Sequence, residues 1–118
     1  MDTCVTALTT LEDFTQKAGF DGASLTFKPG KPRVVMLKSE GCSNCRDMQK
    51  TLERWASEHQ NIDVYILNTE GNGAFLRPLG ITAVPTQLFI DKNGSMTEVV
   101  GGESEPNNIA LRELSRSL

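Results

Sequence analysis

Short apolar runs alternate along this chain with polar segments in which apolar residues recur every three or four positions. The clearest run, residues 33–38, is rich in β-branched and other apolar side chains, which is typical of a strand buried on both faces. Further strands are predicted at residues 62–67, 86–90 and 95–100, and a short first strand at residues 5–8.

The segments between these runs have the periodicity of helices. After Cys45, the apolar side chains follow one stripe of an amphipathic helix, at Met48, Leu52, Trp55 and Ala56. Three other helices are predicted: over residues 11–18 between an N-cap at Thr10 and a stop at Gly19, over residues 74–79 with a break at Pro78, and from about residue 105 to Leu118 after an N-cap at Ser104. Strands and helices therefore follow the order βαβαβαββα.

This order predicts an α/β fold of one domain, residues 1–118, with a central mixed sheet of four to five strands flanked by helices. The first strands are expected to be parallel. Residues 91–94, Asp-Lys-Asn-Gly, are typical of a hairpin turn and make the last two strands antiparallel. Residues 25–27 precede a turn rich in proline and glycine, and form either an extra strand or an extended approach to the next one.

Composition and charge exclude several classes of protein. Of 118 residues, 38% are apolar and 23% charged, which is ordinary for a globular domain. The formal charge of −3 is too mild to indicate nucleic acid or an anionic membrane as a partner. No stretch approaches the roughly 18 consecutive apolar residues that span a bilayer, and the first residues do not begin a signal peptide. A cytoplasmic location is expected for the chain as given; the alternative is a periplasmic or secreted protein whose signal peptide has been removed.

Two of the three cysteines, Cys42 and Cys45, lie three residues apart at the start of a predicted helix. Three cysteines cannot all pair within one molecule, so redox chemistry is a better interpretation than a disulfide-stapled scaffold. Positions i and i+3 on a first helical turn are close enough for a disulfide. The positive end of the helix favours a thiolate at Cys42, and Cys45, one turn further in, is expected to be more buried and able to resolve a mixed disulfide. The pattern predicts dithiol–disulfide exchange without a cofactor.

Other interpretations of these residues remain open. Cys42 and Cys45 could form a permanent disulfide, or half of a tetrahedral zinc site whose remaining ligands would have to come from Cys4 and His59. The simpler expectation is no metal, with Cys4 a small buried hydrophobe, His59 a polar residue at a helix end and Trp55 part of the core.

Residues 34–45, Val-Val-Met-Leu-Lys-Ser-Glu-Gly-Cys-Ser-Asn-Cys, resemble the strand, turn and helix that carry the redox motif in the thioredoxin superfamily. Residues 80–86, Gly-Ile-Thr-Ala-Val-Pro-Thr, resemble the family segment whose proline is cis and faces the cysteines. Residues 91–94 resemble the hairpin turn that follows it. The resemblance extends from about residue 34 to the C-terminus, and residues 1–33 fit it only loosely.

The resemblance implies a thioredoxin fold and a thiol–disulfide oxidoreductase that acts on protein disulfides or dithiols, as a monomer and with an electron donor still to be identified. It implies a cis bond before Pro85, which exposes the backbone of Val84 to a substrate strand, and a glycine, Gly101, that lets a peptide approach. Gly41, Ser43 and Asn44, which flank the cysteines, complete the expected substrate-binding surface. The alternative is a non-catalytic binding module with the same groove and a structural or regulatory disulfide.

Five positions depart from the family pattern: Met36, Lys38, Gly41, Ser43 and Asn44. Where thioredoxins have Trp-Cys-Gly-Pro-Cys, this chain has Gly-Cys-Ser-Asn-Cys at residues 41–45. Met36 stands where the family has a buried acidic residue, so the usual proton acceptor for Cys45 is missing. Lys38 either places a positive charge near the sulfurs and stabilises the thiolate, or points to solvent at the end of its strand. The loss of the tryptophan and the proline from the motif favours a narrower range of clients than that of a general reductase.

Overall fold

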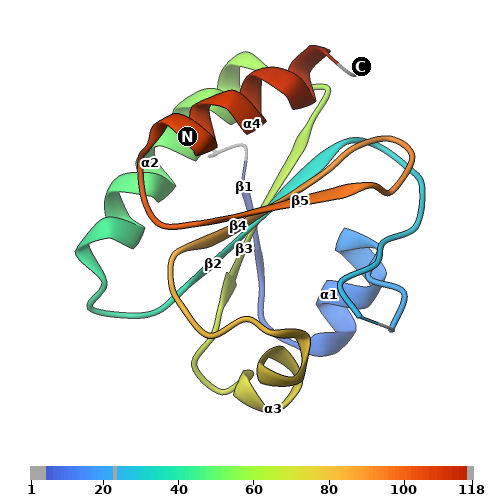
Figure 1. The fold of residues 1–118 in the computed structure, drawn as a ribbon, viewed down its shortest axis with the longest axis vertical. Helices are drawn as coiled ribbons and strands as arrows, with labels where there is room; N and C mark the ends of the chain where they lie inside the picture. Colours follow the sequence, from blue (N-terminus) through green and yellow to red (C-terminus); the bar gives the residue numbers. More distant parts are fainter. Residues whose placement is uncertain (1–4, 23, 117–118) are drawn as a thin grey trace.

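The computed structural model describes residues 5–22 and 24–116, and it contains a five-stranded sheet in the order β1-β3-β2-β4-β5. Figure 1 shows α2 and α4 on one face of this sheet and α1 and α3 on the other. The elements are β1 (Val5–Leu8), α1 (Leu11–Ala18), β2 (Arg33–Lys38), α2 (Ser43–Glu58), β3 (Asp63–Asn68), α3 (Gly73–Leu76), the 3₁₀ helix η1 (Arg77–Leu79), β4 (Thr86–Ile90), β5 (Met96–Val100) and α4 (Glu105–Arg116).

The strand directions confirm the predicted α/β class and the mixed sheet. β1 and β2 both pair with β3 in parallel, whereas β4 pairs with β2 and β5 in antiparallel register. Residues 25–27 do not form a strand, because Leu25 lies in a turn. Phe27 makes an isolated bridge to Phe20, since α1 ends only at Ala18 and leaves a short segment to pair with.

The first helix begins and ends as its sequence predicts. The side chain of Thr10 accepts a hydrogen bond from the backbone N–H of Asp13 at 3.1 Å, which satisfies one of the free donors of the first turn. Gly19 ends the helix in the left-handed region with a φ of 82°, a conformation that favours glycine. This stop turns the chain towards the connection that leads into β2.

Each face of the sheet covers its own apolar core, and β2 contributes to both. Val34 and Met36 pack with residues of α2 and α4, whereas Val35 and Leu37 pack with residues of α1 and α3. All four side chains are fully buried. The prediction that residues 33–38 form a strand buried on both faces is confirmed, and this rigid strand leads directly into the cysteine pair.

The other residues that the sequence singled out lie away from the cysteine pair or outside the described part of the chain. Trp55 is partly buried against the core under α2, as expected, and the ring of His59 stacks on it at the end of that helix with a centroid distance of 4.4 Å. Cys4 and Leu118 lie outside the described residues.

Within residues 5–22 and 24–116, no cluster of three or more His, Cys, Asp or Glu side chains could hold a metal ion. None of the helices there has the length and apolar character to cross a membrane.

Candidate active site

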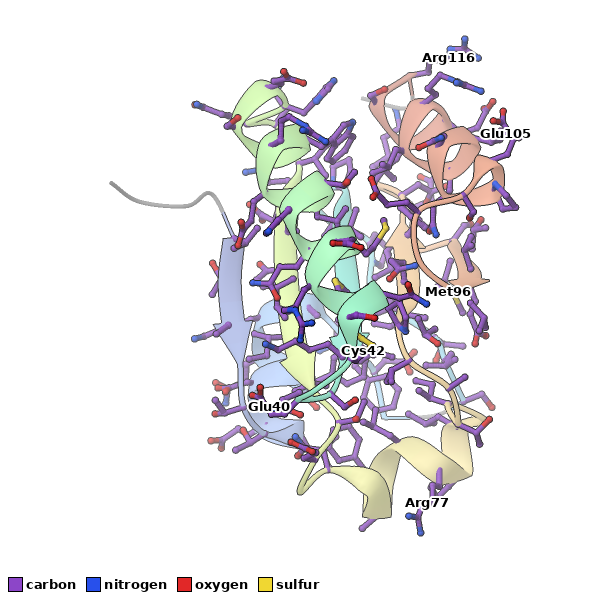
Figure 2. The ribbon with its side chains drawn as sticks, turned by 90° about the vertical axis from the view of Figure 1, so that its left-hand side faces the viewer. Glu40, Cys42, Arg77, Met96, Glu105 and Arg116 are labelled. Carbon is purple, nitrogen blue, oxygen red and sulfur yellow. A yellow bond between two sulfur atoms is a disulfide. The ribbon has the colours of Figure 1, made fainter. Side chains whose placement is uncertain are left out.

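Cys42 and Cys45 are joined by a disulfide at the start of α2, with their Cα atoms 5.2 Å apart. Cys42 is the N-cap of the helix, and its Sγ accepts a hydrogen bond from the backbone N–H of Cys45 at 3.1 Å. Figure 2 shows Cys42 where the chain passes from β2 into α2. A sulfur therefore occupies the position that a serine or aspartate oxygen takes at many helix N-termini, next to the positive end of the helix.

The two sulfurs have different surroundings. Cys45 is 1% exposed and packs in the same core cluster as Met36 and Met48, whereas Cys42 is only partly buried at its edge. The prediction that Cys45 is the more buried cysteine is confirmed. The carboxyl end of β2 and the first turn of α2 thus hold one accessible and one inaccessible sulfur within a single disulfide.

The residues that flank the cysteines leave Cys42 open to solvent on one side. Gly41, Ser43 and Asn44 are all exposed. Gly41 has a φ of 74°, and a side chain there would point into open space. The turn before α2 therefore needs glycine for its backbone conformation and places no bulky group over the disulfide.

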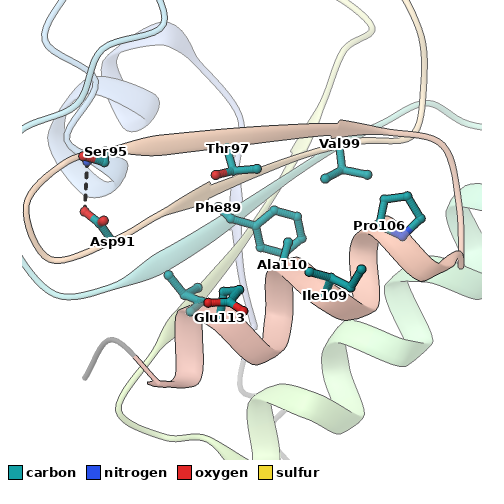
Figure 3. Close-up of a pocket in the computed structure, with 10 residues that line it drawn as sticks. Phe89, Asp91, Ser95, Thr97, Val99, Pro106, Ile109, Ala110 and Glu113 are labelled. Atoms are coloured by element: carbon teal, nitrogen blue, oxygen red, sulfur yellow. Dashed lines mark hydrogen bonds between the residues drawn. The ribbon is translucent and has the colours of Figure 1, made fainter.

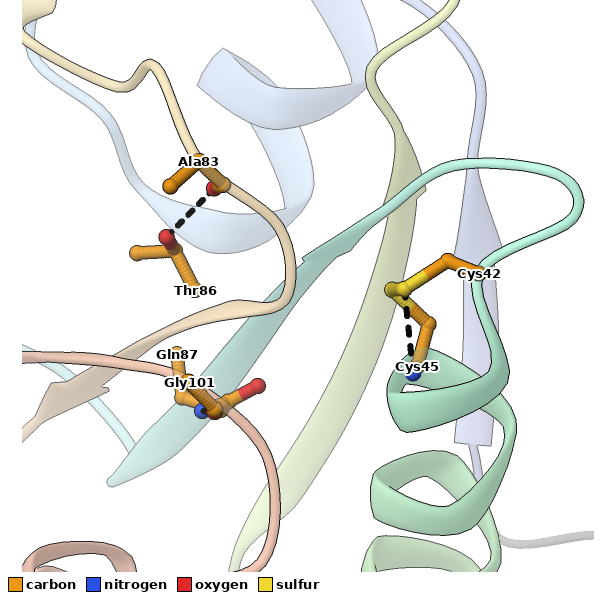
Figure 4. The surroundings of a disulfide bond; sticks show 6 residues. All are labelled: Cys42, Cys45, Ala83, Thr86, Gln87 and Gly101. Carbon is orange, nitrogen blue, oxygen red and sulfur yellow. Dashed lines mark hydrogen bonds between the residues drawn. A yellow bond between two sulfur atoms is a disulfide. The ribbon is translucent and has the colours of Figure 1, made fainter.

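The segment that the sequence predicted to face the cysteines does lie in their surroundings. The Val84–Pro85 bond is cis, as expected, and Thr86 Oγ1 donates to the carbonyl of Ala83 at 2.7 Å, which closes the turn (Figure 4). Val84 packs against the same core cluster as Cys42. Within the described residues, the backbone N–H and C=O of Val84 have no hydrogen-bond partner. This main chain is therefore free to bind an extended peptide.

The loop that follows β5 completes the site. The backbone N–H of Gly101 donates to the carbonyl of Pro85 at 2.8 Å, so the glycine lies next to the cis proline. A side chain at Gly101, whose φ is 112°, would point into open space, whereas one at Gly102 would come within 3.3 Å of Asn44 Cβ. Three segments far apart in the sequence, at residues 41–45, 83–86 and 101–102, thus meet around the disulfide (Figure 4).

Lys38 is the last residue of β2. It is half-buried and lines a cavity of about 340 Å³ on the α2 side of the sheet, where Gln49 and Glu53 also contribute. Its side chain therefore faces polar groups of α2. An effect of Lys38 on the thiolate stays a prediction.

Two further hollows lie on different sides of the molecule. A cavity of about 270 Å³ adjoins the cis-proline segment and is lined by Ser39, Thr69, Gly73, Leu76, Arg77, Ile81, Thr82, Ala83 and Val84. A cavity of about 550 Å³ lies between β5 and α4 and contains neither cysteine (Figure 3). Both acidic side chains in its lining have partners, since Asp91 accepts backbone N–H groups of its own turn and Glu113 pairs with Arg116. Neither cysteine lines either of these two cavities, but the smaller one includes Ala83 and Val84 of the cis-proline segment.

Comparison with known proteins agrees with this geometry. Residues 25–113 match the family model of the thioredoxin-like domain. The chain belongs to the thioredoxin-like family. A thioredoxin from Borreliella burgdorferi is 27% identical to it over 96 residues, which cover 78% of this chain and 81% of that protein.

Solved structures show the same fold for this thioredoxin-like protein. Oxidized thioredoxin O1 from Arabidopsis thaliana superposes with a TM-score of 0.76 at 24% identity, over 94% of this chain and 97% of that one. The long form of spinach chloroplast thioredoxin f has a TM-score of 0.75 at 24% identity, over 96% and 87%. The family, the fold and the cysteine pair at bonding distance together support a thiol–disulfide oxidoreductase of the thioredoxin type.

One part of this thioredoxin-like site was missed in the sequence. Gln87 and Asn107 are buried side by side and bind the carbonyl of Gly101, the glycine next to the cis proline. The available signal was a glutamine inside the apolar run Thr86–Ile90. A polar side chain at the centre of a buried strand has to find partners, so it indicates an internal hydrogen-bond network.

Proposed function

We propose that this protein exchanges electrons with protein disulfides, with Cys42 as the attacking thiolate and Cys45 as the resolving thiol. The observation that carries the proposal is the asymmetry of the pair. The Sγ of Cys42 is partly exposed at the N-terminus of α2 and accepts the N–H of Cys45, whereas Cys45 itself is 1% exposed. A client can reach only the first sulfur, and only the first sulfur lies at the positive end of the helix.

The exchange proceeds in two displacements that need no cofactor. In the first, the Cys42 thiolate attacks one sulfur of a client disulfide, so a Cys42–client bond forms, the client S–S bond breaks and the released client sulfur takes up a proton. In the second, Cys45 loses its proton and attacks the Sγ of Cys42, which restores the internal disulfide and releases the other client sulfur as a thiol. Two electrons pass from the protein to the client, and a donor dithiol returns them in the reverse sequence.

The client segment is proposed to lie across the three segments around the disulfide. An extended peptide would pair with the unpartnered backbone of Val84, beside Pro85, and pass over Gly101, where no side chain blocks it. Gly41, Ser43 and Asn44 would contact the same peptide from the other side. Hydrogen bonds between the backbone of Val84 and the backbone of the client select an extended conformation of the client. They do not depend on the side chains of the client.

We further propose that residues 1–118 act as one domain and as a monomer, because the proposed exchange needs only groups from a single chain. The role of Lys38 in this scheme is electrostatic. An ammonium group at the end of β2 favours a negative charge on Cys42 over the neutral thiol.

Reduction of insulin disulfides by dithiothreitol tests the proposal, with turbidity from the precipitating insulin chains as the readout. The wild-type protein is expected to accelerate the reaction, and Cys42→Ser is expected to return it to the uncatalysed rate. A matched control is Ser57→Ala, which alters an exposed side chain in the last turn of α2 and leaves the cysteines intact. No acceleration by the wild-type protein would favour a binding module over an oxidoreductase.

A further inference from the structure

A buried glutamine holds the loop after β5 through one end of its amide group. Gln87 is 0% exposed, and its Nε2 donates to the carbonyl of Gly101 at 2.9 Å, to Oδ1 of Asn107 at 3.0 Å and to the carbonyl of Val99 at 3.3 Å. All three partners are acceptors. The amide orientation is therefore fixed, because the reversed amide would place an oxygen against three other oxygens.

The other end of the same amide has no partner. Oε1 of Gln87 is buried and receives no hydrogen bond from the residues that the structure describes. An unsatisfied buried acceptor destabilises the folded state, and folded proteins keep few of them. Three apolar residues follow Gln87 in β4 and all five residues of the strand are buried, so a buried glutamine with an unpartnered oxygen is unexpected at this position.

Gln87 and the cysteine pair lie on the same face of the sheet, the one that α2 and α4 cover. Nε2 is bonded to acceptors of β5, of α4 and of the loop between them, so the oxygen of this planar group is directed away from those acceptors. Met36 of β2 is the cross-strand neighbour of Gln87, and Met36 packs in the same core cluster as Cys45. Gln87 is among the residues around the disulfide in Figure 4.

The geometry points to a partner that exists only in the reduced protein. In the disulfide, Cys45 has no proton to donate. When a donor dithiol supplies two electrons and two protons, the S–S bond breaks, both cysteines become thiols and the donor becomes a disulfide. Cys45 then carries a buried S–H donor. We propose that Oε1 of Gln87 accepts the hydrogen bond of this thiol, directly or through one buried water, and so stabilises the dithiol relative to the disulfide.

This inference rests on the proposed function and makes Gln87 a positioning residue for the resolving thiol. Its structural role, holding Gly101, uses Nε2 alone. The two roles can be separated by a pair of variants. Gln87→Met keeps the length and shape of the side chain and removes the oxygen, whereas Asn107→Ala disturbs the network at Nε2 and leaves Oε1 in place, because Val99 and Gly101 still hold the amide.

The equilibrium between dithiol and disulfide in glutathione buffers is the first readout. Gln87→Met is expected to shift the constant about tenfold towards the disulfide, which corresponds to about 30 mV for a two-electron couple. Asn107→Ala is expected to lower the stability of the oxidised protein while moving this constant by less than about twofold. Equal shifts in the two variants would overturn the inference, because a purely structural role predicts them.

The S–H stretching band of Cys45 is the second readout, and it needs no substitution at Gln87. In a protein with Cys4→Ser and Cys42→Ser, Cys45 is the only thiol, and its infrared band is expected at the lowered frequency of a hydrogen-bonded S–H. Adding Gln87→Met should raise that frequency. A band at the free-thiol frequency would overturn the inference even if Gln87→Met fails to fold. Both readouts are independent of insulin turnover, so loss of turnover would reject the proposed function alone.

Discussion

The backbone N–H of Cys45 points at the Sγ of Cys42 across 3.1 Å. This hydrogen bond lies in the first turn of α2. The buried residue, Cys45, therefore donates a hydrogen bond to the accessible sulfur of Cys42. When the disulfide opens, the same N–H and the other free donors of that turn stabilise negative charge on Cys42. The division of labour between the two cysteines therefore follows from where the helix begins.

Alkylation of the reduced protein should label Cys42 before Cys45. At mildly acidic pH only a thiolate stabilised by the helix N-terminus reacts at a useful rate with iodoacetamide, and Cys45 is both buried and one turn further in. The experiment uses a Cys4→Ser background and peptide mass mapping of the labelled site. Equal or preferential labelling of Cys45 would contradict the assignment of roles.

Replacing Gly101 should lower the stability of the protein and also slow its exchange with clients. Gly101 has a φ of 112°, so Gly101→Ala is expected to destabilise the protein by about 1–2 kcal/mol through backbone strain. The added methyl group also points into the open space where a client strand is proposed to lie. Exchange with a peptide disulfide should therefore slow severalfold, as measured by stopped-flow fluorescence.

Gly22→Ala is the matched control for that substitution. Gly22 also has a positive φ, 90°, and open space around it, but it lies in the connection between α1 and β2. It should lower the free energy of unfolding by a similar amount and leave the exchange rate unchanged. A similar slowing in both variants would show that strain, and not contact with the client, is the cause.

Asp13 should contribute stability that depends on pH. Its carboxylate accepts the backbone N–H and the hydroxyl of Thr9, each at 2.9 Å, and the backbone hydrogen bond is the main cause that holds the pKa of Asp13 below its ordinary value of 3.8. A carboxyl group with a lowered pKa stabilises the fold above that ordinary value and loses its effect as the pH falls through the folded-state pKa. Asp13→Asn should therefore lower Tm at neutral pH.

The difference in Tm between Asp13→Asn and the wild-type protein should narrow once the pH falls below 3.8. Glu12→Gln, at the neighbouring exposed position in the same turn, controls for the general loss of negative charge near the start of α1. Thermal unfolding followed by circular dichroism at several pH values measures both variants. A Tm difference between Asp13→Asn and the wild-type protein that stays constant down to the lowest pH would contradict the stabilising role of the Asp13 carboxylate.

Arg33 should be a strong determinant of stability although it is a charged residue in a strand. It is 5% exposed, and its guanidinium donates to the carbonyls of Ala18, Lys28 and Lys31. Burial lowers the pKa of Arg33 from its ordinary value, but each of the three guanidinium nitrogens donates to a carbonyl. Arg33→Met should reduce the free energy of unfolding by about 2–4 kcal/mol in urea titrations. Arg54→Met, at an exposed position of α2, should change it by less than about 0.5 kcal/mol.

Local patterns were sufficient to predict most of the fold. The residues of α1, β2 and β4 were predicted with the bounds that the structure has, because caps, β-branched runs and turn residues act over a few positions. Residues 25–27 were ambiguous, since a single bridge to Phe20 depends on how the α1–β2 connection folds back and not on the segment itself. The predicted helix over residues 74–79 is split into α3 and η1 at its proline.

The candidate site was predicted in part. A cysteine pair at a helix start and a Val-Pro-Thr segment are visible in the sequence, and the resemblance to a family connected them. The network of Gln87 and Asn107 was not visible, because the partner of a buried polar side chain is set by tertiary packing between β4 and α4. The cavity that Lys38 lines together with Gln49 and Glu53 was not visible either, because it depends on how α2 crosses the sheet.

Trapping of mixed disulfides tests most directly whether Cys42 attacks and Cys45 resolves. Cys45→Ser and Cys42→Ser, both in a Cys4→Ser background, would be reduced and mixed with a disulfide-containing client, and adducts would be quantified on non-reducing gels. Cys45→Ser is expected to accumulate a covalent adduct through Cys42, because the second displacement is removed and the first is intact. Cys42→Ser should form almost none, since Cys45 is buried. Equal adduct yields from the two variants would contradict the account.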